Sequence, residues 1–441
     1  MSGPGRLRPG ALLELAIDEL GARGDGIARL AGGRVLVPLT LPGERWRVRL
    51  ATRKGGDWRA RAVERLGGAS LDGPARVDPP CRHFGRCGSC ALQHLPADAY
   101  AAFKRERVAV ALRRAGLPET LVEEPLISPP GSRRRVRLGF VRGQGGRTRL
   151  GYRERLGRAL VPIEVCPIAL PAIERVLAPL AACLDGLDLA AGGGEVAVTA
   201  TDEGLDVLLR CEDAASLADR ERLAAFADCA DLARLSLAEQ GMEPAPVAVR
   251  RTPVVRLGGL RVDLPAGAFL QATEQGEAAL QRHVRDWVPQ QAAVLDLYAG
   301  LGTLSLPLLG HARRLVLAES EPSAVAAARS AVQQAGIAGV EPVRRDLERE
   351  PYLERELAAF DCVLLDPPRA GAAAQARALA ASAVPRVVYA SCDPGSFARD
   401  ARVLAQGGLA LRAVQPVDQF LYSPEVELVA LFSREERRKG G

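Results

Sequence analysis

Two side chains near the end of the sequence are candidates for covalent catalysis and proton transfer. Cys392 follows the apolar run PRVVYAS and precedes Asp393-Pro394, a pair that typically begins a helix. A helix N-terminus favours a thiolate, whereas the charge of Asp393 opposes it. Glu427 interrupts the apolar run VELVALF, and because no histidine lies in this region, a carboxylate is the expected base. Taken alone, Cys392 could equally be a small buried residue and Glu427 a strand-edge residue.

A glycine turn earlier in the sequence is typical of a nucleoside-binding site. The run DLYAGLGT, residues 296–303, follows an apolar strand, so its backbone amides can approach a ligand closely. Glu319 ends the next predicted strand, where an acidic side chain can bind ribose hydroxyls. Ser305 replaces the third glycine of a dinucleotide motif and no P-loop is present, which favours S-adenosylmethionine as the ligand. Together with Asp366-Pro367-Pro368 at a later strand end, the pattern indicates a methyltransferase.

A cysteine on the rim of a methyltransferase suits methylation of carbon 5 of uracil. That carbon is a poor nucleophile toward a sulfonium methyl group. Addition of a thiolate to carbon 6 creates an enolate that reacts at carbon 5, after which a base must remove the carbon 5 proton. Cys392 is therefore the expected nucleophile, and Glu427 the expected base.

The elements that position these residues form the final third of the chain. Apolar runs AAVLDLYAG, RRLVLAE, FDCVLLDPP and PRVVYASC alternate with Ala-rich helical segments, as in a doubly wound α/β domain with a parallel sheet. Residues 11–66 alternate apolar and polar positions between Gly and Pro turns, which predicts a small β-barrel. We expect a barrel over 1–70, a central α+β domain carrying a cysteine cluster over 71–265, and a Rossmann-like methyltransferase domain over 266–441.

The bulk composition is that of a soluble globular protein, with 441 residues, 48% hydrophobic and 25% charged. No apolar run reaches the about 18 residues of a membrane helix, and the chain does not open on a signal peptide. We therefore expect a cytoplasmic monomer with no membrane partner. The net charge of +6 fits a nucleic-acid partner without identifying one.

Four of the nine cysteines are spaced as in a metal site. Cys81-x5-Cys87-x2-Cys90 is followed by the distant Cys166. This spacing leaves zinc and iron–sulfur both open, with His94 as an alternative fourth ligand for zinc. We expect the other four outside the catalytic region to be core residues: Cys183, Cys211, Cys229 and Cys362.

From Phe269 onward the sequence resembles the RNA 5-methyluridine methyltransferase family, whose members act on ribosomal and transfer RNA. The matching segments are, in order, FLQATEQ, DLYAGLGTLSLPL, LLDPPRAG, YASCDPGSFARD and VELVALFSR. The resemblance implies Cys392 as nucleophile and Glu427 as base. It also implies S-adenosylmethionine contacts from Gln271, Tyr298, Thr303, Glu319, Asp346 and Asp366.

The front of the chain resembles the same family. Residues 8–66 look like the small TRAM-type RNA-binding barrel of many members, and CRHFGRCGSCALQH looks like their [4Fe-4S] segment. The resemblance implies a structural cluster, because methyl transfer by this route needs no electron. Barrel and cluster together are similar to the ribosomal branch, so we expect 23S ribosomal RNA as substrate ahead of transfer RNA. The implied cluster ligands are Cys81, Cys87, Cys90 and Cys166.

The sequence departs from the family pattern at four positions. Thr273, Thr303 and Asp393 stand where the family often has Asn, and Glu425 stands where a His often precedes the base. If Glu425 and Glu427 share a strand face, like-charge repulsion should raise the pKa of Glu427.

Several segments are candidates for RNA contacts. The basic stretch Arg133–Arg135 with Arg137 and the predicted basic helix from Lys104 to Arg114 could line a path for phosphates, although each is more often a solvated face. The stacking candidates are Tyr298, Phe269 and Phe420.

Two further functions are open on the sequence. A nitrogen-directed methyltransferase would use Asp-Pro-Pro to hold an amino group, but that class usually has an aromatic residue where Arg369 stands. An RNA-binding protein with a degenerate methyltransferase domain would bind no cofactor and would lose no function on Cys392→Ala substitution.

Overall fold

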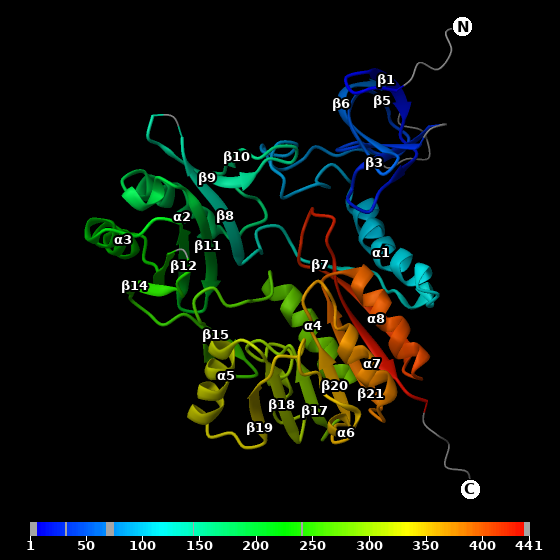
Figure 1. Cartoon of the computed structure of the whole chain (residues 1–441), viewed down its shortest axis with the longest axis vertical. Helices are drawn as coiled ribbons and strands as arrows, with labels where there is room; N and C mark the ends of the chain where they lie inside the picture. The colour runs from blue at the N-terminus through cyan, green and yellow to red at the C-terminus, as the bar shows by residue number, and fades with distance from the viewer. Residues whose placement is uncertain (1–6, 31–32, 68–74, 144, 240, 436–441) are drawn as a thin grey trace. The chain divides into compact units, whose positions relative to one another are not determined.

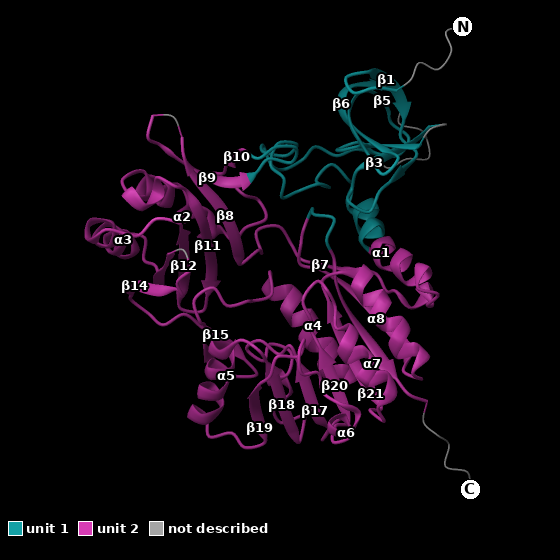
Figure 2. Cartoon of the chain, in the orientation of Figure 1, with its two compact units in different colours: residues 1–104, 153–158, 422–425 teal, residues 105–152, 159–421, 426–441 magenta. Residues whose placement is uncertain are grey.

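In a computed structural model of the chain, the described residues are 7–30, 33–67, 75–143, 145–239 and 241–435 (Figure 1). They form two compact units (Figure 2). Unit 1 comprises residues 1–104, 153–158 and 422–425, and unit 2 comprises residues 105–152, 159–421 and 426–441. The predicted three-domain boundaries stay a prediction.

Unit 1 contains a six-stranded sheet in the order β1-β5-β6-β4-β3-β2. Its edge strands β1 and β2 are consecutive in the chain and are separated by only Ile17 and Asp18. Because the three residue steps from Ala16 to Glu19 span at most about 11 Å, the sheet must curl strongly to bring its edges together. The curled sheet encloses an apolar cluster that includes Val35, Val48 and Trp58. A closed barrel stays a prediction. The strands are β1 (Leu12–Ala16), β2 (Glu19–Leu20), β3 (Gly26–Leu30), β4 (Gly33–Val37), β5 (Arg45–Lys54) and β6 (Asp57–Gly67).

The rest of unit 1 contains the cysteine segment, the first part of helix α1 (Ala97–Arg114) and the short segments 153–158 and 422–425. The carbonyl oxygen of Tyr422 accepts hydrogen bonds from the amides of Ala91 at 2.7 Å and Leu92 at 3.0 Å. Lys104 is fully buried, and its Nζ donates to the carbonyl oxygen of Glu425. Lys104 therefore joins helix α1 to the segment 422–425 within unit 1. The expectation that it lines a phosphate path was wrong, because its side chain is buried.

Unit 2 contains a seven-stranded sheet in the order β10-β9-β8-β11-β12-β13-β14, against which helices α2 and α3 pack. Helix α2 (Pro171–Asp185) buries Ile173, Leu177 and Leu180. Helix α3 (Leu217–Cys229) begins with a Ser216–Asp219 capping box. The strands are β8 (Arg135–Arg142), β9 (Thr148–Arg153), β10 (Leu160–Pro162), β11 (Gly194–Thr201), β12 (Gly204–Cys211), β13 (Arg234–Glu239) and β14 (Ala245–Val249), followed by the separate hairpin of β15 (Val254–Leu257) and β16 (Leu260–Asp263).

Unit 2 also contains an eight-stranded sheet in the order β19-β18-β17-β20-β21-β23-β22-β7. The five strands from β19 to β21 in this order, including β18, β17 and β20, are mutually parallel. Strand β23 lies between β21 and β22 and runs antiparallel to both. This is the predicted doubly wound α/β arrangement. The strands are β7 (Leu126–Ile127), β17 (Ala293–Leu297), β18 (Arg314–Glu319), β19 (Val340–Arg344), β20 (Cys362–Leu365), β21 (Arg386–Ser391), β22 (Ala410–Asp418) and β23 (Glu427–Ser433).

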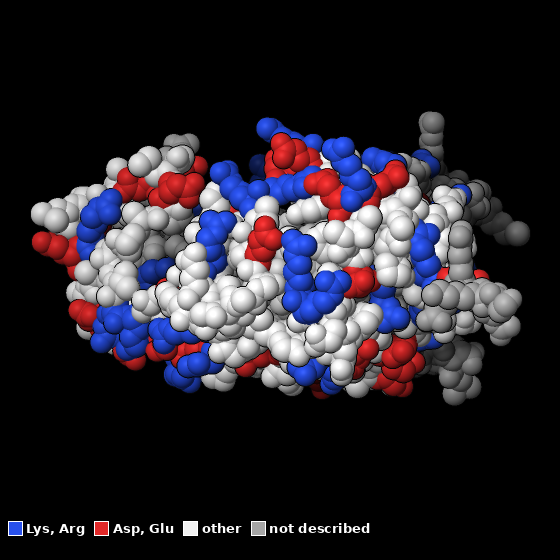
Figure 3. Space-filling model, turned by 90° about the horizontal axis from the view of Figure 1, so that it is seen from below, with Lys and Arg blue, Asp and Glu red and all other residues white. Residues whose placement is uncertain are grey.

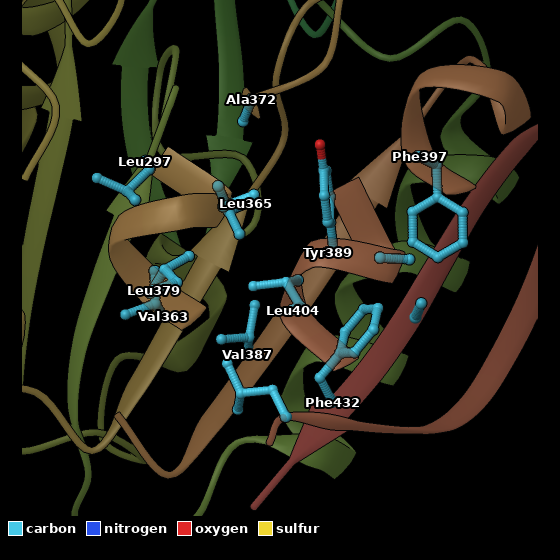
Figure 4. Packing of buried hydrophobic residues seen from close by; sticks show 14 of the residues in the cluster. Leu297, Val363, Leu365, Ala372, Leu379, Val387, Tyr389, Phe397, Leu404 and Phe432 are labelled. Carbon is cyan, nitrogen blue, oxygen red and sulfur yellow. The ribbon is translucent and has the colours of Figure 1, made fainter. Parts of the chain in front are cut away.

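Successive residues of these strands enter apolar cores on opposite faces of the sheet. Leu295 belongs to the core with α1, α7 (Ala373–Ala381) and α8 (Pro394–Gln406), and Val294 to the core with α4 (Glu274–Trp287) and α5 (Pro322–Gln334). In the first core, Tyr389 and Phe397 meet edge to face at 5.5 Å between centroids (Figure 4). The short α6 (Glu354–Leu357) completes the set, and no helix within the described residues is long and apolar enough to cross a membrane.

The four cysteines that were predicted to be core residues differ in exposure. Cys211 and Cys362 are buried and Cys183 is partly buried, but Cys229 is exposed at the end of α3. The prediction was therefore wrong for Cys229, because this position falls on the solvent side of the last helical turn.

Candidate active site

The predicted catalytic and cofactor residues of unit 2 gather at one edge of the eight-stranded sheet. Parallel strands end at the same edge, and β23 runs antiparallel to them, so its first residue also lies there. Side chains from six strands therefore converge. They are Tyr298 after β17, Glu319 at the end of β18, Asp346 after β19, Asp366 after β20, Cys392 after β21 and Glu427 at the start of β23.

Strand register brings Cys392 and Glu427 together. Strands β21 and β23 pair antiparallel, with Ser391 opposite Leu428. Cys392 therefore follows directly on β21 where Glu427 begins β23, and the charge of Glu427 acts on the Cys392 thiol. Asp393 caps α8 by accepting a 2.8 Å hydrogen bond from the amide of Ser396, and Pro394 is the first helical residue, as predicted.

Two amide side chains are hydrogen-bonded in sequence to the carboxylate of Asp366. Gln271 Nε2 donates to the Asp366 carboxylate at 3.2 Å, and Gln419 Nε2 donates to Gln271 Oε1 at 2.8 Å. Arg134 Nε donates to the carbonyl oxygen of Gln271 at 3.0 Å. Gln271 is thus held from both ends, with its amide nitrogen committed to the acidic group of the Asp-Pro-Pro motif.

Burial disfavours ionisation of Cys392, Glu427 and Asp366, which we call the catalytic end of the site. It raises the pKa of Cys392 to about 12, and the charges of Glu427 and Asp366 add to this while Arg369 opposes it. Burial and the charge of Asp366 raise the pKa of Glu427 well above its ordinary value. Asp366 is only half-buried as a residue, yet the protein around its carboxyl group raises its pKa to about 6. These three groups lie close enough to affect one another's ionisation.

The glycine turn after β17 has the backbone that a bound nucleoside requires. Tyr298 adopts φ 62°, which is costly for an aromatic residue, and Gly300 follows at φ 55°. A Cβ atom at Gly300 would find no atom within 4 Å, so the turn is open on that side. Burial raises the pKa of Tyr298 to about 12, so its hydroxyl stays neutral.

Glu319 is fixed by hydrogen bonds to its carboxylate. One oxygen accepts from the amide of Gly300 at 2.9 Å. The other accepts from the amides of Ser320 and Glu321 at 2.7 and 2.8 Å, and from the Ser320 hydroxyl at 3.0 Å. Glu319 thereby joins the glycine turn to the end of β18. Of the remaining candidates, Thr303 is buried in the turn while Asp346 is exposed.

The chain is similar to several RNA methyltransferases. Residues 265–435 match the family described as tRNA (Uracil-5-)-methyltransferase. A Caulobacter vibrioides protein named as an uncharacterized RNA methyltransferase is 40% identical over 96% of this chain and 100% of its own length. The 23S rRNA (uracil(1939)-C(5))-methyltransferase RlmD of Chromohalobacter salexigens is 34% identical over 96% of this chain and 90% of that protein.

The chain belongs to the RNA uracil-5 methyltransferase family. The crystal structure of Pyrococcus abyssi tRNA (uracil-54, C5)-methyltransferase in complex with S-adenosyl-L-homocysteine has a TM-score of 0.74. The match covers 95% of this chain and 99% of the Pyrococcus abyssi chain, at 23% sequence identity. The predicted family and the predicted α/β methyltransferase fold are thus both confirmed.

Two of the residues that depart from the RNA uracil-5 methyltransferase pattern cap helices. Thr273 caps α4, where its Oγ1 accepts from the amide of Gly276 at 3.1 Å, and Asp393 caps α8. Asn, Asp and Thr all serve as N-caps. The expected repulsion between Glu425 and Glu427 is a different case. Because β23 begins at Glu427, Glu425 lies outside the strand, and the argument from a shared strand face does not apply.

Sequence analysis missed several residues that support the site. Gln419 bonds to Gln271, and its Oε1 accepts from the amide of Thr273 at 3.4 Å. Buried Asp400 accepts from the Tyr389 hydroxyl at 2.8 Å and from the amide of Ala372 at 2.7 Å, which fixes the loop after Asp-Pro-Pro. Gln419 lies in none of the matching segments, and its partner Gln271 is 148 residues away. Asp400 ends the matching segment YASCDPGSFARD, but nothing in the sequence gave it a role.

The structure is consistent with only some of the predicted RNA contacts. Arg134 is buried in an ion pair with Glu277, so it cannot line a phosphate path. Arg135 instead lies over the ring of Phe269 at 5.3 Å, and Phe269 is 63% exposed. Arg133 lies over Phe420 at 5.9 Å. On the face shown in Figure 3, basic and acidic side chains are interspersed and form no single basic patch.

None of the four predicted metal ligands takes part in a disulfide bond within the described residues. Cys87, Cys90 and Cys166 are buried and Cys81 is partly buried. Cys166 belongs to unit 2 and the other three to unit 1. Within the part of the chain that the structure describes, no group of three or more His, Cys, Asp or Glu side chains is placed to hold a metal ion. An iron–sulfur cluster therefore stays a proposal.

Proposed function

We propose that this protein transfers a methyl group from S-adenosylmethionine to carbon 5 of a uridine in RNA. The observation that carries the proposal is that Cys392 directly follows β21 where the buried Glu427 begins the neighbouring strand β23, at the edge of the sheet that carries the glycine turn. A nitrogen-directed methyltransferase has no use for this pair, because amino and ring nitrogens attack a sulfonium methyl without covalent activation.

Six residues would hold the cofactor. The open side of the turn at Gly300 fits the approach of a nucleoside, and fixed Glu319 would accept hydrogen bonds from ribose hydroxyls. When bound, S-adenosylmethionine supplies an electrophilic methyl group. The Pyrococcus abyssi relative holds S-adenosyl-L-homocysteine, the demethylated form of that cofactor. The proposed contacts are Gln271, Tyr298, Thr303, Glu319, Asp346 and Asp366.

In the proposed mechanism Cys392 is the nucleophile and Glu427 the base. The Cys392 thiolate forms a bond to carbon 6, and the electron pair of the 5,6 double bond moves into an enolate. Carbon 5 then takes the methyl group, and its proton passes to the Glu427 carboxylate. The electrons released by this proton transfer restore the double bond and expel the thiolate. The raised pKa of Glu427 suits this step, because a base must hold the proton it accepts.

The RNA substrate that we favour is 23S ribosomal RNA. The support is the similarity to RlmD, which extends over 96% of this chain. The alternative is transfer RNA, which the family description and the Pyrococcus abyssi structure name. A uridine within folded RNA would have to be single-stranded or flipped out to reach the sheet edge.

The front of the chain would serve RNA binding and stability. We propose a TRAM-like RNA-binding barrel over residues 1–70, a central domain over 71–265 and the methyltransferase domain over 266–441. The four cysteines Cys81, Cys87, Cys90 and Cys166 would hold a structural [4Fe-4S] cluster, on the support of their spacing in the sequence. No step of the reaction passes through the cluster. Iron and sulfide contents of anaerobically purified protein, against zinc content, test this part.

The test of function is nucleoside analysis of methylated RNA. Wild-type protein is incubated with methyl-labelled S-adenosylmethionine and either 23S ribosomal RNA or transfer RNA from cells lacking the gene. We expect labelled 5-methyluridine in the ribosomal RNA only. Label in an N-methylated nucleoside would overturn the reaction, and 5-methyluridine in transfer RNA would overturn the substrate. No label in either RNA, without measurable cofactor binding, would identify a degenerate methyltransferase domain.

A further inference from the structure

The loop between β22 and β23 leads directly to the proposed base. It spans residues 419–426, and Glu427 follows it as the first residue of β23. From Glu427 onward the sheet places the backbone, because Glu427 pairs with Val417 of β22 and Leu428 pairs with Ser391 of β21. On the other side of Glu427 the backbone continues into the loop. The position of the base therefore also depends on what holds the loop.

Tyr422 in this loop is held on both sides of its backbone. Its amide donates to the Tyr100 hydroxyl at 2.7 Å, and its carbonyl oxygen accepts from the amides of residues 91–92 at 2.7 and 3.0 Å. Tyr422 adopts φ 61°, a left-handed conformation that is costly for an aromatic residue. Such a conformation persists only where the surroundings fix it, and these hydrogen bonds do so.

Lys104 of α1 holds the end of the same loop. Its Nζ donates to the carbonyl oxygen of Glu425, lies 5.3 Å from the centre of the Tyr100 ring, and is fully buried with the rest of the side chain. Burying an ammonium group costs free energy, whereas a methionine of similar length would fill the space without that cost. Packing alone therefore does not account for a lysine here. A charge-assisted hydrogen bond does, since it is roughly twice as strong as a neutral one.

We infer that Lys104 and Tyr100 position Glu427 for removal of the carbon 5 proton, by fixing the loop that precedes it. The inference rests on the proposed function. Glu425 and Glu427 are two residues apart, so their Cα atoms lie within about 7 Å of each other and a shift of the first is carried to the second. Lys104 and Tyr100 act through the backbone of the loop, which makes them positioning residues.

Proton removal is the step that should depend on this positioning. A general base must lie within hydrogen-bond reach of the proton that it takes, and a misplacement of about 1 Å can cost about 10²-fold in rate. In the proposed mechanism, addition of Cys392 and methyl transfer both precede the work of Glu427. A loosened loop should therefore leave those steps intact and slow only the release of the methylated covalent complex.

The experiment separates proton removal from the earlier steps. The variants are Lys104→Met, Tyr100→Phe and the control Arg377→Met, which removes an exposed cation in α7. For each protein we measure the dissociation constant of S-adenosylmethionine, the rate of trapping on 5-fluorouracil-containing RNA, and turnover on ordinary RNA. Denaturing electrophoresis with labelled cofactor measures the methylated covalent complex on ordinary RNA. Thermal unfolding shows whether each variant is folded.

For Lys104→Met we expect turnover to be about ten- to a hundredfold slower, with the methylated covalent complex accumulating on ordinary RNA. Trapping and cofactor affinity should change less than about twofold. Tyr100→Phe removes one acceptor and keeps the ring, so we expect the same pattern with an effect of about threefold. Arg377→Met should behave as wild type.

Two results would overturn the inference. One is wild-type turnover in both variants, and the other is an equal fall in trapping, cofactor binding and turnover, which would show a general loss of structure. If Lys104→Met does not fold, Tyr100→Phe decides by the same criteria. If wild type were not trapped on 5-fluorouracil-containing RNA, the proposed function itself would fail, which is a distinct result.

Discussion

The two ends of the active edge treat their acidic groups in opposite ways. At the cofactor end, the Glu319 carboxylate accepts four hydrogen bonds from Gly300, Ser320 and Glu321 before any ligand arrives. At the catalytic end, burial and the charge of Asp366 raise the pKa of the Glu427 carboxyl group, and no hydrogen bond contributes to that shift.

The difference separates binding groups from reactive groups. A carboxylate that is already hydrogen-bonded is held in one charge state and one orientation, as a ribose-binding group requires. A group that must change its protonation during turnover gains from having no fixed partner, since each partner would stabilise one state at the expense of the other. The predictions below test whether this contrast governs function.

The largest expected effect is the loss of Cys392. Cys392→Ser should lower the methylation rate at least about a thousandfold, because no thiolate remains to activate carbon 5. Affinity for S-adenosylmethionine should change less than about twofold, which equilibrium titration measures. Cys229→Ala, at an exposed cysteine in α3, is the control and should keep full activity. Comparable activity of the Cys392→Ser variant would refute covalent catalysis.

The pH dependence of covalent bond formation tests the same residue. Because the pKa of Cys392 is raised to about 12, the thiolate fraction grows about tenfold per pH unit across the neutral range. The rate at which wild type is trapped on 5-fluorouracil-containing RNA should therefore rise steadily from pH 6.5 to pH 9. A plateau below pH 8 would show that the thiol ionises far more easily than its surroundings predict.

The next effect is at Glu427. Glu427→Gln should slow turnover about 10²- to 10⁴-fold, since the amide cannot take the carbon 5 proton. Methyl transfer precedes that step, so a methylated covalent complex should accumulate on ordinary RNA, visible by denaturing electrophoresis with labelled cofactor. Glu341→Gln, on β19 and exposed, should turn over normally. If Glu427→Gln slowed turnover without accumulating the complex, Glu427 would act before methyl transfer.

A smaller effect is expected at the cofactor end. Glu319→Gln replaces an acceptor of backbone amides with a group that presents a donor to at least one of them. We expect about tenfold weaker binding of S-adenosylmethionine, equivalent to about 1.4 kcal/mol, and an unchanged rate at saturation. Glu321→Gln, at the N-cap of α5, is the neighbouring control. A fall in the saturated rate as large as that of Glu427→Gln would erase the distinction between the two ends.

The sequence predicted where several strands end better than it predicted which strands pair in the sheet. The apolar runs that form β17, β18, β20, β21 and β23 were recognised, and each carries a site residue at its predicted end. Strand β22 (Ala410–Asp418) was missed because Arg412, Gln415 and Pro416 interrupt its apolar pattern. The short β7 joins the same sheet through pairing with Val417 and Asp418, almost three hundred residues further along the chain. Periodicity is local, so it cannot detect such a pairing.

The same limit applies to the site. Motifs identified Cys392 and the acidic residues of the proposed site, because their types and spacing suit the proposed chemistry. Gln419 was missed because it matters only through Gln271, which lies 148 residues earlier. The raised pKa values of Cys392 and Glu427 also depend on burial, which follows from the packing of several strands.

The smallest expected effect concerns Thr273, the N-cap of helix α4. Thr273 Oγ1 accepts from the amide of Gly276 and lies 2.8 Å from Ser128 Oγ. Thr273→Ala should cost about 1–2 kcal/mol of unfolding free energy in urea, because a buried cap and its partner lose their bonds. Thr273→Ser keeps the hydroxyl and should cost less. Because Gln271 lies two residues before the cap, the alanine variant should weaken cofactor binding a few-fold and leave the saturated rate unchanged. A fall in that rate would mean that the cap also positions the catalytic end.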